Sequence, residues 1–290
     1  MAVYERTYRA WSGERTPERW RFLVLPRYAY RQVFRSRLFS GFLVLCFVPT
    51  LVLAMRIYLP YNLGLLKSLG AEAQGFRTFL DVDAETFLKY MVWQAVVAFL
   101  VTFIIGPALI STDLRNNGLP LYLSRPFSRV EYILGKSAVL LILLSAVTWV
   151  PGWLLFGLKA YLAGWSWFRD NARIAAAIFF GAWTWIVVLC LLTLALSAYL
   201  KWKPLAQAAL FGVFFVAMAN GGLINVLFHT SWGSLINLLD LLQVVWAGLF
   251  GVERQVDIPV WCAWASLLAV CAGCLLLLAR KLRAYEVVRG

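Results

Sequence analysis

The chain has 290 residues, of which 62% are hydrophobic and 14% are charged, and it carries a formal net charge of +13. A soluble globular domain averages about 45–50% apolar and roughly 25% charged residues. The composition therefore excludes an ordinary soluble protein and predicts an integral membrane protein.

The first 37 residues form a basic N-terminal segment in which arginines are mixed with large apolar side chains. Thr16 can cap a helix, and Pro17 suits the first helical position. The apolar residues that follow recur at helical spacing: Trp20, Leu23, Val24, Tyr30 and Phe34. We expect an amphipathic helix in the membrane interface, interrupted near Pro26. The segment lacks an apolar core with a small-residue cleavage site, so we expect no cleaved signal peptide.

A membrane span needs about 20 predominantly apolar residues. Six stretches meet this length: 38–58, 90–110, 137–158, 174–199, 204–228 and 260–279. We expect helices, because a segment in lipid must satisfy its own backbone polar groups. The alternating pattern of barrel strands is not seen in these continuous runs. The predicted fold class is therefore an all-α integral membrane protein, with a six-span transmembrane domain over residues 38–279.

Local features modify this simple arrangement of spans. Four motifs can kink or open a helix: Pro49, Gly106-Pro107, Pro151-Gly152 and Asn220-Gly221-Gly222. The outer connection 229–257 contains the apolar run "SLINLLDLLQVVWAGLF". Its polar residues Asn237, Asp240 and Gln243 are three apart and share one helical face. We predict an interfacial or re-entrant outer helix in this connection.

Charge is distributed unequally between the two sides of the membrane. With six spans, one side holds residues 1–37, the loop 111–136, the link 200–203 and the tail 280–290. These segments contain 19 of the 27 Lys and Arg residues. The positive-inside rule places this side, with both termini, in the cytoplasm. Anionic lipid headgroups account for the basic face better than nucleic acid does, so we expect a lipid membrane and no nucleic acid as partner.

Three features resemble catalytic or cofactor motifs without meeting their requirements. Gly135-Lys136-Ser137 resembles the end of a phosphate loop, but the required earlier glycine is Val130. Cys271 and Cys274 lie inside the sixth span, where cysteines pack as small apolar residues. His229 is the only histidine. We therefore expect no enzyme activity, no metal site and no cofactor bound by this chain.

The central parts of the predicted spans contain no Asp, Glu, Lys or Arg. The polar residues there are neutral: Gln94, Gln207, Asn220 and Asn225. An intramembrane ionisable residue is costly and usually marks a proton or ion pathway. This pattern argues against a proton relay and implies an energy source outside the spans.

The segment 113–137, "DLRNNGLPLYLSRPFSRVEYILGKS", is too elaborate for a passive connection. Asn116 or Asn117 can cap a short helix that Pro126 would stop. Three apolar residues would share one side of that helix: Leu119, Tyr122 and Leu123. Ser128 and Glu131 form a capping box that begins the next helix. A well-capped helical hairpin without a partner remains the alternative interpretation.

This segment resembles the loop between the second and third spans of ABC-2 type ABC transporter permeases. The matching residues are Asp113, Gly118, Pro126, Ser128, Arg129, Gly135 and Lys136. The wording "LPLYLSRP" is typical of the branch near multi-copper-enzyme maturation permeases. Many members have a polar Thr and Glu after the glycine, whereas Leu119 and Leu121 stand at comparable places here. The resemblance extends to the basic N-terminal helix, the six spans and the outer helix.

The resemblance implies that residues 116–125 form a coupling helix seated in a groove of a separate ABC ATPase subunit. Two permeases, either two copies or this chain with a paralogue, would assemble with two ATPases that bind ATP and Mg. The residues implied in coupling are Asp113, Arg115, Asn117, Gly118, Leu119, Tyr122, Leu123, Arg125, Pro126 and Arg129. Arg115, Arg125 and Arg129 would pair with acidic residues of the ATPase. Leu119, Tyr122 and Leu123 would form the buried anchor.

The function implied is the permease subunit of an ATP-driven exporter in a prokaryotic inner (plasma) membrane. Two alternatives belong to other classes. A self-sufficient secondary transporter or membrane enzyme would act without ATP, and a membrane scaffold would transport nothing.

Overall fold

The computed structural model describes residues 17, 22–62, 81–118 and 128–283. This part of the chain is helical, without strands, and six of its helical segments are long and apolar enough to cross a membrane. Their bounds are Arg37–Tyr61, Ala84–Arg115, Arg129–Ala163, Ala172–Tyr199, Lys203–Phe228 and Val260–Lys281. The prediction of an all-α protein with six apolar spans is confirmed, and the chain is a multi-pass membrane protein by this criterion.

The first span is built from two helices, and a third helix precedes it. Helix α1 (Val24–Val33) leads to α2 (Arg37–Leu45), which Ser36 caps by accepting the Phe39 N–H. The span continues as α3 (Val48–Tyr58) and a 3₁₀ turn, η2 (Leu59–Tyr61). The break at residues 46–47 precedes Pro49, which has no N–H to donate to the carbonyl of Leu45.

The expected interruption at Pro26 is wrong. Pro26 lies in the first turn of α1, where a missing N–H costs no intrahelical hydrogen bond. The helix therefore begins close to the proline instead of stopping there. Thr16 and Trp20, which were expected to belong to the same helix, lie outside the described residues.

Prolines also divide the second and third spans, as predicted. The second consists of α6 (Ala84–Ile105) and α7 (Ala108–Arg115), with the break at Gly106-Pro107. The third consists of α9 (Arg129–Val147) and α10 (Trp149–Ala163). Their junction is Thr148, three residues before Pro151, with φ −102° and ψ −85°. A short helix, α11 (Trp165–Asp170), follows α10.

The second half of the chain contains two long unbroken spans, an outer helix and a final span. Helix α12 (Ala172–Tyr199) is followed by α13 (Lys203–Phe228), the 3₁₀ turn η3 (Trp232–Leu235), α14 (Leu238–Phe250) and α15 (Val260–Arg283). The connection 229–257 contains a helix, α14, as predicted. Asn237 does not share a helical face with Asp240 and Gln243, because it caps α14 by accepting the Leu239 N–H.

Helix α13 is continuous through Asn220-Gly221-Gly222, one of the motifs that can kink or open a helix. Gly221 instead permits a close approach by η3. A β-carbon added at Gly221 would lie 2.8 Å from the carbonyl oxygen of Gly233. The glycine therefore permits the close packing of η3 on α13.

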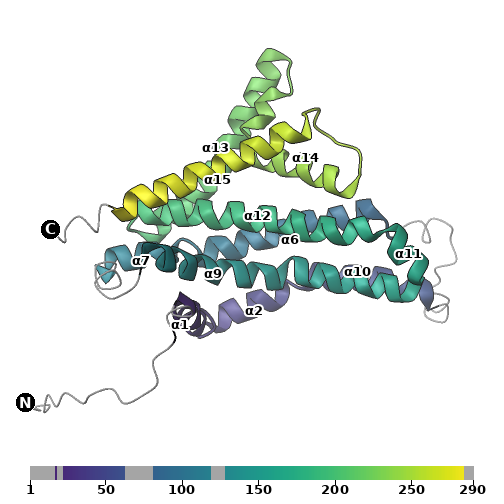
Figure 1. Cartoon of the computed structure of the whole chain (residues 1–290), viewed down its shortest axis with the longest axis horizontal. Coiled ribbons are helices and arrows are strands. Elements are labelled where there is room, and N and C mark those ends of the chain that lie inside the picture. The colour runs from purple at the N-terminus through teal and green to yellow at the C-terminus, as the bar shows by residue number, and fades with distance from the viewer. Residues whose placement is uncertain (1–16, 18–21, 63–80, 119–127, 284–290) are drawn as a thin grey trace, which may run out of the picture.

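Helix α12 is the centre of the bundle and packs against α6, α9, α10, α14 and α15. Figure 1 shows α6, α9, α10 and α12 running along the long axis of the molecule, whereas α13 and α15 slant away from it. Helices α1 and α2 lie on the other side of this central layer (Figure 1). Much of the apolar surface of α13 is exposed, including Phe211, Phe215 and Val226.

Neutral polar side chains predicted within the spans join neighbouring helices. The Gln94 side-chain amide donates to Thr50 Oγ1 and to Tyr90 OH, at 3.0 Å in both cases. Gln207 Nε2 donates to the carbonyl oxygen of Phe103 at 3.0 Å. These bonds satisfy the amide nitrogens and offset part of the cost of placing an amide among apolar residues, whereas Gln94 Oε1 has no hydrogen-bond partner.

Candidate functional site at the base of the 116–128 connection

The connection between the second and third spans is shorter than the predicted loop 111–136. Helix α7 extends to Arg115, and α9 already begins at Arg129. Asn116 ends α7, so of the two residues expected to precede a new helix only Asn117 stands in that place, directly before the helical Gly118. Asn117 has a φ of 50°, the left-handed conformation that commonly follows a helix end and that asparagine tolerates well. The chain therefore turns at these two residues.

Several residues of the proposed coupling segment cannot be placed. Gly118 is helical and half-buried. Five others lie outside the described residues: Leu119, Tyr122, Leu123, Arg125 and Pro126. Arg115 is exposed in the last turn of α7, and Arg129 is the half-buried first residue of α9.

The capping box predicted at Ser128 is confirmed. The Ser128 N–H donates to Glu131 Oε2 at 2.6 Å, and Ser128 Oγ accepts the Glu131 N–H at 3.2 Å. These reciprocal bonds satisfy two backbone donors that would otherwise have no partner at the start of α9. They also fix where the connection ends.

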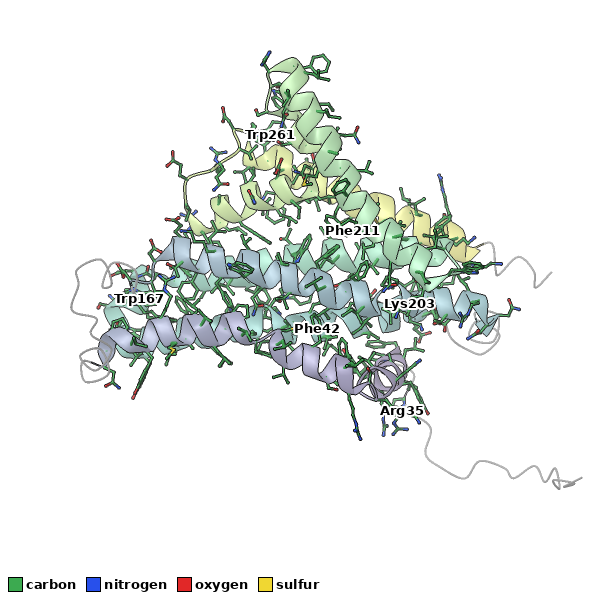
Figure 2. The ribbon with its side chains drawn as sticks, turned by 180° about the vertical axis from the view of Figure 1, so that it is seen from behind. Arg35, Phe42, Trp167, Lys203, Phe211 and Trp261 are labelled. Carbon is green, nitrogen blue, oxygen red and sulfur yellow. The ribbon has the colours of Figure 1, made fainter. Side chains whose placement is uncertain are left out.

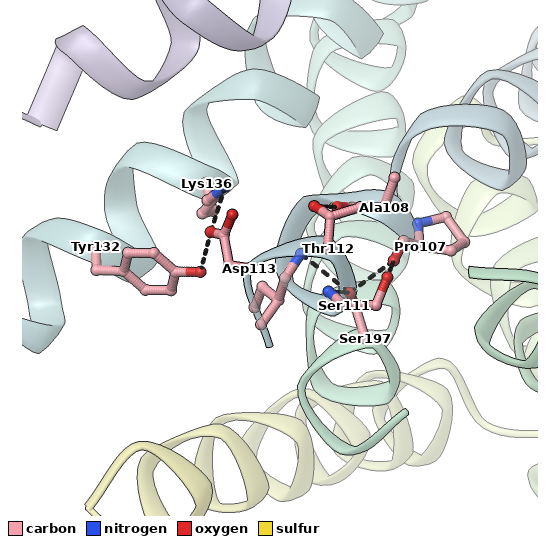
Figure 3. Close-up of polar contacts among 9 residues, drawn as sticks. Pro107, Ala108, Ser111, Thr112, Asp113, Tyr132, Lys136 and Ser197 are labelled. Atoms are coloured by element: carbon pink, nitrogen blue, oxygen red, sulfur yellow. Dashed lines mark hydrogen bonds and ion pairs between the residues drawn. The ribbon is translucent and has the colours of Figure 1, made fainter. Parts of the chain in front are cut away.

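Three side chains join the two ends of the connection, and we call them the loop-base cluster: Asp113, Tyr132 and Lys136. Lys136 Nζ lies 2.8 Å from Asp113 Oδ2, and the Tyr132 hydroxyl donates to the same oxygen at 2.7 Å (Figure 3). Asp113 belongs to α7, whereas Tyr132 and Lys136 are one turn apart on α9. The cluster holds the end of the second span against the beginning of the third.

The ion pair is largely removed from water. The side chains of Lys136 and Asp113 keep only 11% and 15% of their exposure. The Lys136 ammonium also lies 5.6 Å from the centre of the Tyr132 ring, within cation–π range. Because each charge would be costly here without the other, the two helices are expected to move together.

A second group of polar contacts, the kink clamp, consists of Pro107, Ser111 and Ser197. Ser197 Oγ on α12 accepts the backbone N–H groups of Ile110 and Ser111, at 3.1 and 2.9 Å, and donates to the Pro107 carbonyl at 2.8 Å (Figure 3). The break at Pro107 leaves donors at the start of α7 without partners in the preceding helix. Ser197, which belongs to another span, supplies the acceptor for these donors and thereby attaches α7 to the centre of the bundle.

Helix α1 packs against the helix that carries Tyr132 and Lys136. The Tyr30 hydroxyl donates to the carbonyl oxygen of Val139 at 2.7 Å. Burial raises the pKa of the Tyr30 phenol to about 12, so the group stays a protonated donor at neutral pH. Gly135 faces α1, and a β-carbon there would lie 2.6 Å from Leu25 Cδ1. Glycine is therefore needed for the close approach of α1 and α9.

Sequence reasoning selected Asp113 and Lys136 through the resemblance alone and did not predict that they pair. It missed Tyr132, although the i, i+4 spacing from Tyr132 to Lys136 places both on one face of a helix. It also missed Ser197. A serine within an apolar span gives no signal of its own, because its partners lie more than 80 residues away in the sequence.

The residues that resembled a phosphate loop and a redox motif lie in surroundings that differ from those of such motifs. Gly135, Lys136 and Ser137 lie inside α9, and Lys136 is paired with Asp113. All five cysteines are free. Within the described ranges, no three His, Cys, Asp or Glu side chains gather in a way that could hold a metal ion.

Comparison with known proteins does not assign the chain to a family. No protein-family model matches the chain, and no curated protein matches it. The functional argument therefore rests on the residues and their geometry. That geometry centres on the loop-base cluster and the kink clamp. It offers a connection whose two ends are joined to each other and to the central helix, which suits the transmission of movement.

Proposed function

We propose that this chain is the membrane-spanning permease subunit of an ATP-driven transporter of the ABC-2 type. It exports a substrate by using ATP hydrolysed on a separate ATPase subunit, which also holds the Mg. The observation that carries the proposal is the loop-base cluster. It makes one mechanical unit of the two helices that flank the segment resembling the coupling loop of these permeases.

The path from this segment into the membrane is short. A push on residues 116–128 acts on α7 and α9 together, because Asp113 is bound to both Tyr132 and Lys136. The kink clamp passes the displacement of α7 to α12 through Ser197. Since α12 packs against most of the other spans, a movement at the connection reaches the whole bundle. This arrangement supports a coupling role.

The distribution of charge supports an energy source outside the spans. Among the described spans, ionisable residues lie near the ends, as with Arg56, Lys136 and Lys159, and not in the middle. A chain of acidic residues or histidines, which a proton-driven transporter would use, has no candidates there. A self-sufficient secondary transporter is therefore the less favoured function.

The proposed assembly contains two permease chains and two ATPases in a prokaryotic inner membrane, with the permease termini in the cytoplasm. Residues 116–125 occupy a groove of the ATPase, with Leu119, Tyr122 and Leu123 as the apolar anchor. Arg115, Arg125 and Arg129 set the orientation by pairing with acidic residues of the ATPase. Such rim charges govern orientation and rate of association more than affinity.

The test replaces Leu119, Tyr122 and Leu123 together by Ala in the full-length chain. We expect normal membrane insertion but at least a tenfold loss of ATPase recovered with the chain in mild detergent, because truncating a buried anchor commonly costs about 2 kcal/mol or more. The measurement is the ratio of ATPase to permease after affinity purification.

The matched control truncates two exposed side chains on α10, Leu154 and Tyr161, which are 70% and 85% exposed. This variant should recover as much ATPase as the unaltered chain. Failure of the unaltered chain to recover any ATPase under gentle conditions would contradict the proposed function. Equal recovery by the triple variant would contradict only the role given to its three residues.

A further inference from the structure

A cleft of about 880 Å³ opens between α1, the beginning of α2 and the kinked α6–α7 pair. Its floor is apolar and includes the buried side chains of Phe39, Ile105 and Leu109. Its rim is basic and carries the exposed residues Arg31, Arg35 and Lys203. Figure 2 shows Arg35 and Lys203 at the same end of the bundle.

The charges around this cleft do not balance. Among the described residues that line it, four are basic and one, Asp113, is acidic. Asp113 is already bound to Lys136 at 2.8 Å. Arg31, Arg35 and Lys203 make no ion pair with any residue in the part of the chain that the structure describes. Three like charges around one cleft repel one another, and an anion between them would relieve this repulsion.

The position of the cleft along the spans indicates which kind of anion it can bind. Arg35 directly precedes the cap of α2, and Lys203 is the first residue of α13. Both cations therefore lie where spans begin, which is the depth of lipid headgroups. Leu38, Val44 and Leu45 on α2 are 88%, 72% and 65% exposed. The apolar floor thus adjoins a surface that faces hydrocarbon in a membrane.

We propose that this cleft binds one anionic phospholipid. The arginine guanidinium groups and Lys203 hold the phosphate, which guanidinium can bind through two hydrogen bonds at once. An acyl chain lies on the floor formed by Phe39, Ile105 and Leu109. A free phosphate ion would leave this floor unused, and an acidic peptide would not match an opening onto the apolar surface of α2.

The experiment measures lipid binding by the purified full-length chain after delipidation, with no ATPase present. Phosphatidylglycerol and phosphatidylcholine with identical acyl chains are added, and bound lipid is counted by native mass spectrometry. Arg31→Gln/Lys203→Gln removes two charges from the cleft. Arg27→Gln/Lys201→Gln is the matched control, because both residues are exposed and neither lines the cleft.

We expect the unaltered chain to prefer phosphatidylglycerol over phosphatidylcholine. The cleft variant should bind phosphatidylglycerol about 30-fold more weakly, from roughly 1 kcal/mol for each basic residue near an anionic surface. The control should lose less than about threefold. An equal loss in both variants would overturn the proposal in favour of general surface attraction, as would equal binding of the two lipids.

Two further measurements distinguish the proposed phospholipid from other possible occupants of the cleft. Inorganic phosphate at millimolar concentration should not displace the lipid, and efficient displacement would show a site for a free anion. Phosphatidylglycerol with a photoreactive acyl chain should label the unaltered chain within residues 24–39 or 104–113. Label found only elsewhere would overturn the proposal even if the cleft variant failed to fold. Because the chain is measured alone, this result does not depend on the proposed transport function.

Discussion

At the scale of single residues, the pair between Asp113 and Lys136 decides how the two spans meet. Each side chain is mostly withdrawn from water, and each would be a costly isolated charge without the other. Tyr132 adds a hydrogen bond to the same carboxylate oxygen and so fixes its direction. The three residues act as one unit, and their contributions should not add independently.

A double-mutant cycle tests this coupling. Asp113→Asn should lower the free energy of unfolding by about 2–3 kcal/mol, somewhat less than the 3–5 kcal/mol for a fully buried pair, because some exposure remains. The double variant Asp113→Asn/Lys136→Met should be more stable than Asp113→Asn alone, because no charge is left unpaired. Thermal unfolding in detergent, followed by tryptophan fluorescence, gives the comparison.

Tyr132→Phe serves as the reference for this cycle, since it removes one hydrogen bond and keeps the ion pair. Its expected cost is about 1 kcal/mol. The cycle also needs Lys136→Met alone. If Asp113→Asn/Lys136→Met lost as much stability as the two single variants together, Asp113 and Lys136 would not be coupled. The loop-base cluster would then not join α7 to α9.

At the scale of elements, the docking of α1 on α9 depends on one missing side chain. Gly135 lets the backbone at Phe22 and the side chain of Leu25 approach α9 closely. Tyr30 then reaches the carbonyl of Val139, one turn further along α9. The amphipathic helix is therefore attached by specific contacts in addition to its affinity for the membrane surface.

Gly135→Ala should weaken this attachment. The added β-carbon would lie 2.6 Å from Leu25 Cδ1 and 2.8 Å from the Phe22 carbonyl oxygen. Such overpacking commonly costs about 1–3 kcal/mol. We expect faster amide hydrogen exchange in the peptide covering α1, together with a lower unfolding temperature of the whole chain.

Gly157→Ala on α10 is the matched control. No atom lies within 4 Å of a β-carbon added there. The substitution should stabilise the chain by up to about 1 kcal/mol, because alanine has the higher helix propensity. If both glycine variants left exchange in α1 unchanged, Gly135 would not be needed for docking.

At the scale of the whole molecule, the asymmetry of charge sets the expected orientation. The end of α7, the link before α13 and the end of α15 lie at one end of the bundle, and α11 lies at the other (Figure 1). Most of the Lys and Arg residues that the structure describes belong to elements at the first end. Lys and Arg are retained on the cytoplasmic side, so we expect this end to face the cytoplasm.

Two cysteine substitutions at exposed positions test the orientation. On intact cells, an impermeant maleimide should label Gln255→Cys but not Lys201→Cys, and permeabilisation should expose the latter. The native cysteines give a low background, since four are buried and Cys271 is half-buried. Labelling of Lys201→Cys on intact cells would reverse the orientation and would place the 116–128 connection out of reach of a cytoplasmic ATPase.

Some features could be predicted from the sequence because they depend on neighbouring residues alone. The capping box at Ser128 and the break near Pro107 are such features. The contact of Gly221 with η3 could not be predicted, because it depends on how the chain folds back after α13. The end of α7 at Arg115 could not be read from the sequence, because α7 packs on α12, which is distant in the chain.

By itself, the sequence determined the membrane class, the six apolar spans, the uneven charge and the places where proline breaks a helix. These follow from transfer of side chains between water and lipid and from local backbone chemistry. Only the tertiary structure decided that Asp113 meets Lys136, that Ser197 satisfies the donors behind Pro107, and that three cations surround one apolar cleft. Those contacts join residues far apart in the chain, and the packing of whole helices determines which of them meet.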